Sequence, residues 1–125
     1  MPVIRHAESR RTETPNAVMT TLASPTLGGA EQAVWRVDMQ PDATGPLHTF
    51  DAEQVWTVVR GGATVELDGE KLTVVAGDTV VMPAAAPRRV SADPEQGFAA
   101  IVASRPGANA SAPDGTGKTV PAWTV

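Results

Sequence analysis

Six short apolar segments, each ended by a turn-forming residue, make up most of residues 17–104 of this 125-residue chain. They are rich in valine and threonine, and several alternate apolar and polar residues, as half-buried strands do. No segment repeats apolar residues with the 3.6-residue period of a long helix. Asp68-Gly69 joins two of the segments and is a strong hairpin signal. The pattern predicts an all-β sandwich or barrel.

Composition narrows the class of protein. The length suits one domain, and the absence of cysteine excludes disulfides, thiolate metal sites and a cysteine nucleophile. A formal net charge of −4 argues against a nucleic-acid partner, which would favour a basic surface. No apolar stretch approaches the roughly 20 residues that span a bilayer, and the N-terminus has no signal-peptide pattern. We therefore expect a cytoplasmic protein without a membrane or nucleic-acid partner.

The two ends differ in composition from the middle of the chain. Residues 1–12 are polar and charged, and are expected to form an arm that is loose or lies on a partner. Residues 13–105 form the predicted barrel. Residues 106–125 form an extension that is rich in small and turn residues and is expected to be flexible. Trp123 lies near its end and is expected to dock on this domain or on a second subunit.

Two spaced motifs give a more specific prediction. The segment "PLHTFDAEQVWTVVRGG", residues 46–62, places His48, Phe50, Gln54 and Gly61 at the intervals of a His-x-His, Glu, Gly motif. A second segment runs from Gly77 through Pro83 to Arg88 and Ala92, at the intervals of a Gly, Pro-x-Gly, His, Asn motif. In this spacing the chain resembles small single-domain cupins of the RmlC-like type. The resemblance implies a double-stranded β-helix, or jelly-roll barrel, and covers most of residues 33–104.

The metal-binding positions of the motifs hold unsuitable residues. In cupins four such positions bind the metal, and here they are His48, Phe50, Gln54 and Arg88. Phenylalanine has no lone pair, arginine stays protonated, and a neutral glutamine is a weak donor. A catalytic first-row metal needs about three protein ligands. We therefore predict no metal and no other cofactor, although Glu53 or Asp51 could in principle replace a lost ligand.

Strand alternation gives an approximate list of residues that face the interior. If His48 and Gln54 point inward, then Phe50, Trp56 and Val58 share their face, because side chains alternate with period two. Arg88 and Val90 would enter from the opposite sheet. The result is an aromatic-walled cavity with few polar groups, typical of small-molecule sites. Candidate catalytic residues are His48, Arg88 and Gln54; candidate substrate-binding residues are Phe50, Trp56, Val58, Val90 and Glu53.

Each candidate also has a purely structural interpretation. His48 could be a core histidine, and Gln54 could fill the space left by a lost metal. Arg88 could form an ion pair with Glu53 or Asp51 or bond to the adjacent turn, or it could recognise a carboxylate, enolate or phosphate. The aromatic residues could be plain core. The sequence leaves these alternatives open.

Cupins that lack a metal include isomerases, epimerases, cyclases and non-catalytic binders, and the resemblance implies one of these activities for this chain. The first expectation is therefore a cofactor-free isomerase, cyclase or lyase acting on a small molecule, anionic or aromatic, in which His48 moves a proton. The alternatives are a non-catalytic sensor or binding module and, third, a metal-dependent dioxygenase. The apolar outward positions around residues 55–59 favour a homodimer.

Overall fold

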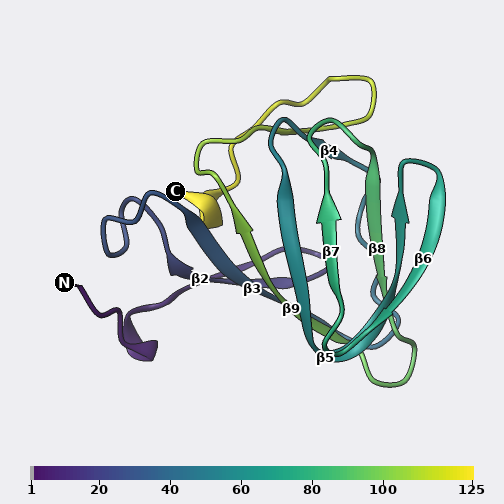
Figure 1. Cartoon of the computed structure of the whole chain (residues 1–125), viewed down its shortest axis with the longest axis horizontal. Helices are drawn as coiled ribbons and strands as arrows, with labels where there is room; N and C mark the ends of the chain where they lie inside the picture. The colour runs from purple at the N-terminus through teal and green to yellow at the C-terminus, as the bar shows by residue number, and fades with distance from the viewer. Residues whose placement is uncertain (1) are drawn as a thin grey trace.

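The computed structural model describes residues 2–125, and almost all of its regular secondary structure is strand (Figure 1). The elements in chain order are η1 (His6–Glu8), β1 (Arg10–Glu13), β2 (Val18–Ala23), β3 (Ala33–Met39), β4 (Thr49–Phe50), β5 (Gln54–Leu67), β6 (Glu70–Val75), β7 (Thr79–Met82), β8 (Arg88–Ala92), β9 (Phe98–Ser104), β10 (Ala110–Ser111) and η2 (Ala122–Thr124). The predicted all-β barrel in a single domain is confirmed. No described residue belongs to a helix that is long and apolar enough to cross a membrane.

Strand β5 belongs to both walls of the barrel. Its first half pairs with β9 and β7, and its second half pairs with β6 and β8. The change falls at a bulge between Val58 and Arg60, followed by Gly61 with a φ of 67°. A Cβ on Gly61 would collide with the carbonyl oxygen of Gly97, so only glycine lets the two strands approach here. Gly61 and Gly62 therefore lie within one continuous strand, which bends at this point.

The core lies between the two walls. In β3 every second residue is buried, from Ala33 through Trp35 and Val37 to Met39, as alternation requires. The predicted hairpin at Asp68-Gly69 joins β5 to β6, and both residues have positive φ. Outside the barrel, one row of apolar residues crosses four strands; this outer apolar row consists of Val34, Ala103, Val55 and Val81.

The ends of the chain pack on the barrel. Residues 10–13, which overlap the end of the predicted arm at residues 1–12, form β1 and pair with β2. Residues 106–125, called here the C-terminal strap, are the yellow end of the chain in Figure 1; they run past β4 and pair with it through β10. The carbonyl oxygen of Trp123 accepts a hydrogen bond from Thr21 Oγ1 at 2.8 Å, so this tryptophan docks on its own domain. Phe50, Ala52 and Ala108 form a small second core beneath the strap.

Candidate functional site

A cavity of about 720 Å³ opens inside the barrel and is lined by three residues of the first cupin-like motif, namely His48, Phe50 and Gln54. Its walls come from β3, β4 and the start of β5, from the turn at residues 14–17, and from the C-terminal strap. All three tryptophans of the chain line it, namely Trp35, Trp56 and Trp123. The lining contains no aspartate, glutamate, lysine or arginine, and His48 is its one ionisable side chain. The cavity is thus apolar, aromatic and uncharged.

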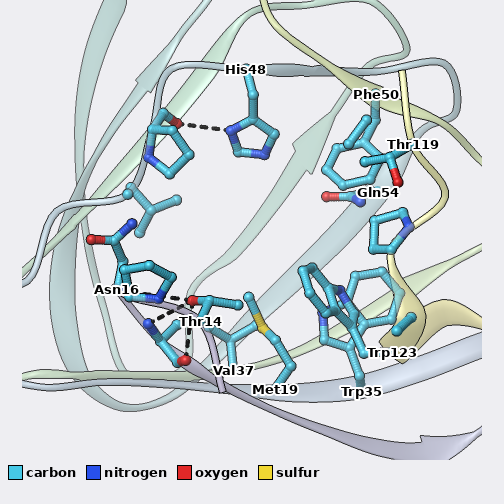
Figure 2. Close-up of a pocket in the computed structure, with 18 of the residues that line it drawn as sticks. Thr14, Asn16, Met19, Trp35, Val37, His48, Phe50, Gln54, Thr119 and Trp123 are labelled. Carbon is cyan, nitrogen blue, oxygen red and sulfur yellow. Dashed lines mark hydrogen bonds between the residues drawn. The ribbon is translucent and has the colours of Figure 1, made fainter. Parts of the chain in front are cut away.

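His48 points into this cavity, facing the side formed by Met19, Trp35 and Val37 (Figure 2). The Nδ1 atom lies 2.8 Å from the carbonyl oxygen of Pro46. A carbonyl can only accept, so Nδ1 carries the proton and Nε2 keeps a free lone pair. The edge of the Phe50 ring packs against the imidazole, with ring centroids 5.4 Å apart, and restricts its rotation. The local structure therefore selects one tautomer of His48 and holds the ring in place.

Electrostatics keeps His48 neutral. Burial lowers its pKa below the ordinary value of 6.5; the Pro46 hydrogen bond opposes this shift, and the nearby charge of Arg88 adds to it. A neutral imidazole with a free Nε2 is a proton acceptor at pH 7.

Gln54 forms a second polar point on the cavity wall. Its side chain is 1% exposed, and its Oε1 accepts hydrogen bonds from Trp56 Nε1 at 3.0 Å and from Arg88 at 3.5 Å. Trp56 in turn stacks on Phe98, with centroids 6.3 Å apart. The amide is therefore held by groups that are themselves fixed.

Arg88 points inward, as alternation predicted, but its guanidinium lies outside the cavity lining. It is fully buried, and its donors bond to the carbonyl oxygens of Pro83 at 2.7 Å and Ala86 at 3.0 Å. The charge also lies 5.7 Å from the centroid of the Phe50 ring. Of the alternatives left open by the sequence, the structure matches bonding to the adjacent turn, which leaves the cavity without a cation.

Two further candidates also lie outside the lining, while Phe50, Trp56 and Val90 are part of it. Val58 faces inward but belongs to the packed core, because alternation gives the direction of a side chain and not its depth along the barrel. Glu53 is exposed and faces a separate shallow cleft beside Arg105, because it has the opposite parity to Gln54. The contacts to a ligand therefore come from a different set of residues than the motif strands alone suggest.

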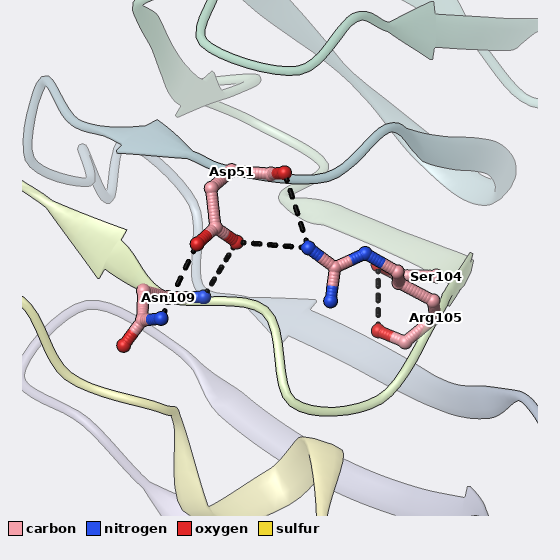
Figure 3. A network of polar contacts seen from close by, with 4 residues as sticks. All are labelled: Asp51, Ser104, Arg105 and Asn109. Carbon is pink, nitrogen blue, oxygen red and sulfur yellow. Dashed lines mark hydrogen bonds and ion pairs between the residues drawn. The ribbon is translucent and has the colours of Figure 1, made fainter.

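Asp51 anchors the C-terminal strap (Figure 3). Its carboxylate accepts the backbone N–H of Asn109 at 2.8 Å and the side-chain N–H of Asn109 at 3.2 Å. Arg105 adds a contact of 3.4 Å to the same carboxylate. These hydrogen bonds from Asn109, more than the nearby cations, lower the pKa of Asp51. Asp51 thus closes one wall of the cavity and is not free to serve as a metal ligand.

The donor set does not fit a metal. Among residues 2–125, no three histidine, aspartate or glutamate side chains lie close enough together to hold an ion. At the four ligand positions of the motifs, Phe50 has no lone pair, Arg88 is a cation, and the oxygen of Gln54 already accepts two hydrogen bonds.

The backbone of the motifs is retained even where their glycines are replaced. The first cupin motif also has a glycine ahead of its histidines, and Asp42 holds that position here; Ala85 holds the glycine position of the Pro-x-Gly part of the second motif. Their φ values are 66° and 67°. Both are in the left-handed region that glycine favours.

Comparisons with known proteins agree with this geometry. A family model for the cupin domain matches residues 35–103. The structure is similar to that of the polyketide cyclase RemF from Streptomyces resistomycificus, with a TM-score of 0.72 and 19% identity over 86% of this chain and 83% of that chain. It is also similar to the structure of KdgF from Halomonas sp., with a TM-score of 0.70 and 21% identity over 84% of this chain and 94% of that chain. A third similar structure is that of the DMSP lyase DddQ from Ruegeria pomeroyi DSS-3, with a TM-score of 0.75 and 18% identity over 89% of this chain and 64% of that chain.

The search of curated proteins found no match. The similarity to the solved structures establishes a shared fold, and the family model covers more than half of the sequence. The resemblance seen in the two motifs is therefore confirmed, and the chain belongs to the cupin family.

Proposed function

We propose that this cupin is an enzyme of the isomerase, cyclase or lyase kind that transfers a proton within an uncharged aromatic substrate, with His48 as the base. The observation that carries the proposal is the hydrogen bond of His48 Nδ1 to Pro46, which leaves Nε2 free to act in the cavity. A structural histidine would have partners for both nitrogens; this one has a single protein partner among the described residues.

The chemistry follows from two groups. His48 Nε2 accepts a proton from a carbon next to a carbonyl group, and the C–H electron pair moves onto the carbonyl oxygen. The Gln54 amide donates a hydrogen bond to that oxygen as it becomes negative. The imidazolium then returns the proton to the same or another carbon, so charge and protons balance. Proton transfer by a positioned histidine contributes about 10²–10⁴-fold to a rate.

The composition of the cavity supports an uncharged, flat ligand. Three indole rings and Phe50 offer apolar faces, and no charged side chain compensates an ionic ligand. Of the two ligand classes expected from the sequence, the aromatic one is therefore favoured over the anionic one. A volume of about 720 Å³ is within the usual range of small-molecule sites. The structural neighbours include a cyclase and a lyase by name, which is compatible with this class of reaction.

The test uses 2-tetralone, an uncharged bicyclic ketone whose carbon-bound protons exchange with solvent deuterium. We expect the protein to accelerate this exchange, and His48→Gln to lower the protein-dependent rate by about 10²-fold. His6→Gln is the matched control, because His6 is the other histidine of the chain and is exposed. An exchange rate that is unchanged in His48→Gln would overturn the proposal.

A non-catalytic binding module is the second candidate. It is favoured by the fact that His48 is the one ionisable group in the lining, so no second side chain is available to shuttle a proton. Because all tryptophans line the cavity, quenching of their fluorescence by 2-tetralone reports binding directly. Quenching without accelerated exchange would identify a binder. About one equivalent of bound metal per chain, measured by elemental analysis, would instead favour the third alternative, a metal-dependent dioxygenase.

A further inference from the structure

Arg88 is a buried cation without an anionic partner. Its side chain is fully buried, and none of the described carboxylates forms an ion pair with it. Backbone carbonyls of Pro83 and Ala86, the Met82 sulfur at 3.8 Å and the Gln54 oxygen take its hydrogen bonds. Burial lowers its pKa to about 10, so the guanidinium is still charged at neutral pH. Such a charge is costly to bury and acts strongly on the dipoles beside it.

The dipole beside it on the cavity side is the amide of Gln54. Two donors, Arg88 Nη1 and Trp56 Nε1, point at one atom of this amide, and only the oxygen can accept them. The flipped orientation would place the amide NH₂ group against both donors. The two contacts therefore fix which end of the amide is the oxygen.

The amide nitrogen is left for a ligand. The Gln54 amide nitrogen has no hydrogen-bond partner among the described residues. Every fully buried side-chain nitrogen or oxygen of these residues does have a partner. The amide nitrogen is therefore not fully buried. Gln54 lines the cavity beside Phe50 (Figure 2). The open space next to the nitrogen is the cavity.

We propose that Arg88 is a positioning residue that, together with Trp56, locks the Gln54 amide so that this wall presents hydrogen-bond donors alone. The site then selects uncharged aromatic ligands with a carbonyl oxygen at this wall, and rejects those that place a group there that can only donate, such as a ring N–H. The inference deepens the proposed function and rests on it in that the ligand occupies the same cavity. The positive charge behind the amide oxygen also polarises the amide and strengthens its N–H donors.

A purely structural role for Arg88, fastening the turn at residues 83–88, predicts something different. Loss of that role would weaken the binding of every ligand to a similar extent. Loss of the positioning role weakens specifically those ligands that have the acceptor oxygen. A matched pair of probes separates the two: 2-tetralone, and 1,2,3,4-tetrahydronaphthalene, which has the same ring system without the oxygen.

The measurement is the ratio of the two dissociation constants by isothermal titration calorimetry. We expect the unmodified protein to bind the ketone roughly tenfold more tightly, as one hydrogen bond to a buried donor allows. Arg88→Met should lower the ratio, although the Trp56 hydrogen bond remains, and Arg88→Lys, which keeps a charge and a donor, should restore part of the loss. Gln54→Glu retains acceptors for Trp56 and Arg88 but offers the ligand no donor, so the ketone should become the weaker ligand.

Urea denaturation of each variant checks folding, and Gln54→Glu keeps the proposal testable if Arg88→Met does not fold. A preference for the ketone that is undiminished in these variants, an equal loss for both probes, or no binding of either probe would overturn it. His6→Gln, at an exposed position outside the cavity lining, should leave the ratio unchanged. Loss of deuterium exchange in His48→Gln tests the proposed function separately, so each can fail while the other holds.

Discussion

Replacing Ala85 with glycine is expected to stabilise the protein. Ala85 occupies a motif glycine position with a φ of 67°, and its N–H donates to the carbonyl oxygen of Phe50 at 2.7 Å. This bond joins the turn that holds Arg88 to the strand β4 that lines the cavity. The left-handed conformation is therefore required by the turn, and an alanine side chain is strained in it.

The size of the effect comes from two opposing terms. A non-glycine residue in the left-handed region costs roughly 1–2 kcal/mol, and glycine relieves that cost. Glycine also increases the conformational entropy of the unfolded chain, which costs about 0.4–1 kcal/mol. The difference leaves a net stabilisation of about 0.5–1 kcal/mol, equivalent to a rise in melting temperature of roughly 2–4 °C for a domain of this size.

Thermal and urea denaturation, followed by tryptophan fluorescence, measure the change. Ala84→Gly and Ala86→Gly are the matched controls, because these neighbours in the same turn do not have positive φ. Each should lose about 0.5–1 kcal/mol through the unfolded state alone. If Ala85→Gly destabilises the protein as much as the controls do, the reasoning about strain is refuted.

Four further outcomes are expected. Gly61→Ala should cost at least about 3 kcal/mol in denaturation, because the new Cβ meets backbone. Gly69→Ala, with open space around it, should cost only about 0.5–1 kcal/mol, the difference between left-handed strain and the smaller entropy of the unfolded chain. Asp51→Asn should speed amide hydrogen exchange at residues 109–111; because the folded-state pKa of Asp51 is lowered, the same loosening should occur in the unmodified protein as the pH falls through that value. The rate at which the protein exchanges the carbon-bound protons of 2-tetralone for deuterium should fall as the pH decreases, with a midpoint below 6.5, because His48 must be neutral to accept a proton. A midpoint at or above 6.5 would contradict the lowered pKa of His48. Light scattering should show that the unmodified protein is a homodimer. Val81→Glu, in the outer apolar row, should convert it to a monomer, and a monomeric unmodified protein would refute this prediction.

The architecture could be predicted because it depends on local signals. Alternation in residues 33–39, the Asp68-Gly69 hairpin and the spacing of the two motifs each carry their meaning within a few residues. The continuity of β5 through Gly61 could not be predicted in this way. A glycine pair can end a strand or bend it, and the local sequence does not distinguish the two cases. Here the close approach to the Gly97 carbonyl shows that the strand bends, and Gly97 lies far from Gly61 in the sequence.

The site was predictable in part for the same reason. Strand alternation predicts that His48, Gln54 and Arg88 point inward. It does not predict that the carbonyl oxygens of Pro83 and Ala86 accept the hydrogen bonds of the Arg88 guanidinium. Trp35 lines the cavity too, and the alternation in β3 was the signal that could have identified it. The strap has no periodicity, and its position depends on the Asp51–Asn109 contact across 58 residues. No local pattern in the sequence encodes such a contact.

The C-terminal strap builds part of the cavity wall from residues outside the segment that defines the family. More than half of the residues that line it lie outside residues 35–103, the part that the cupin family model describes. Drift in the strap and in the turn at residues 14–17 can therefore reshape the cavity while the barrel is preserved. Family membership assigned from the barrel consequently carries little information about the ligand. Exchanging residues 106–123 between cupins is a direct route to new ligand preferences, because the exchanged piece forms wall and leaves His48 and Gln54 in place.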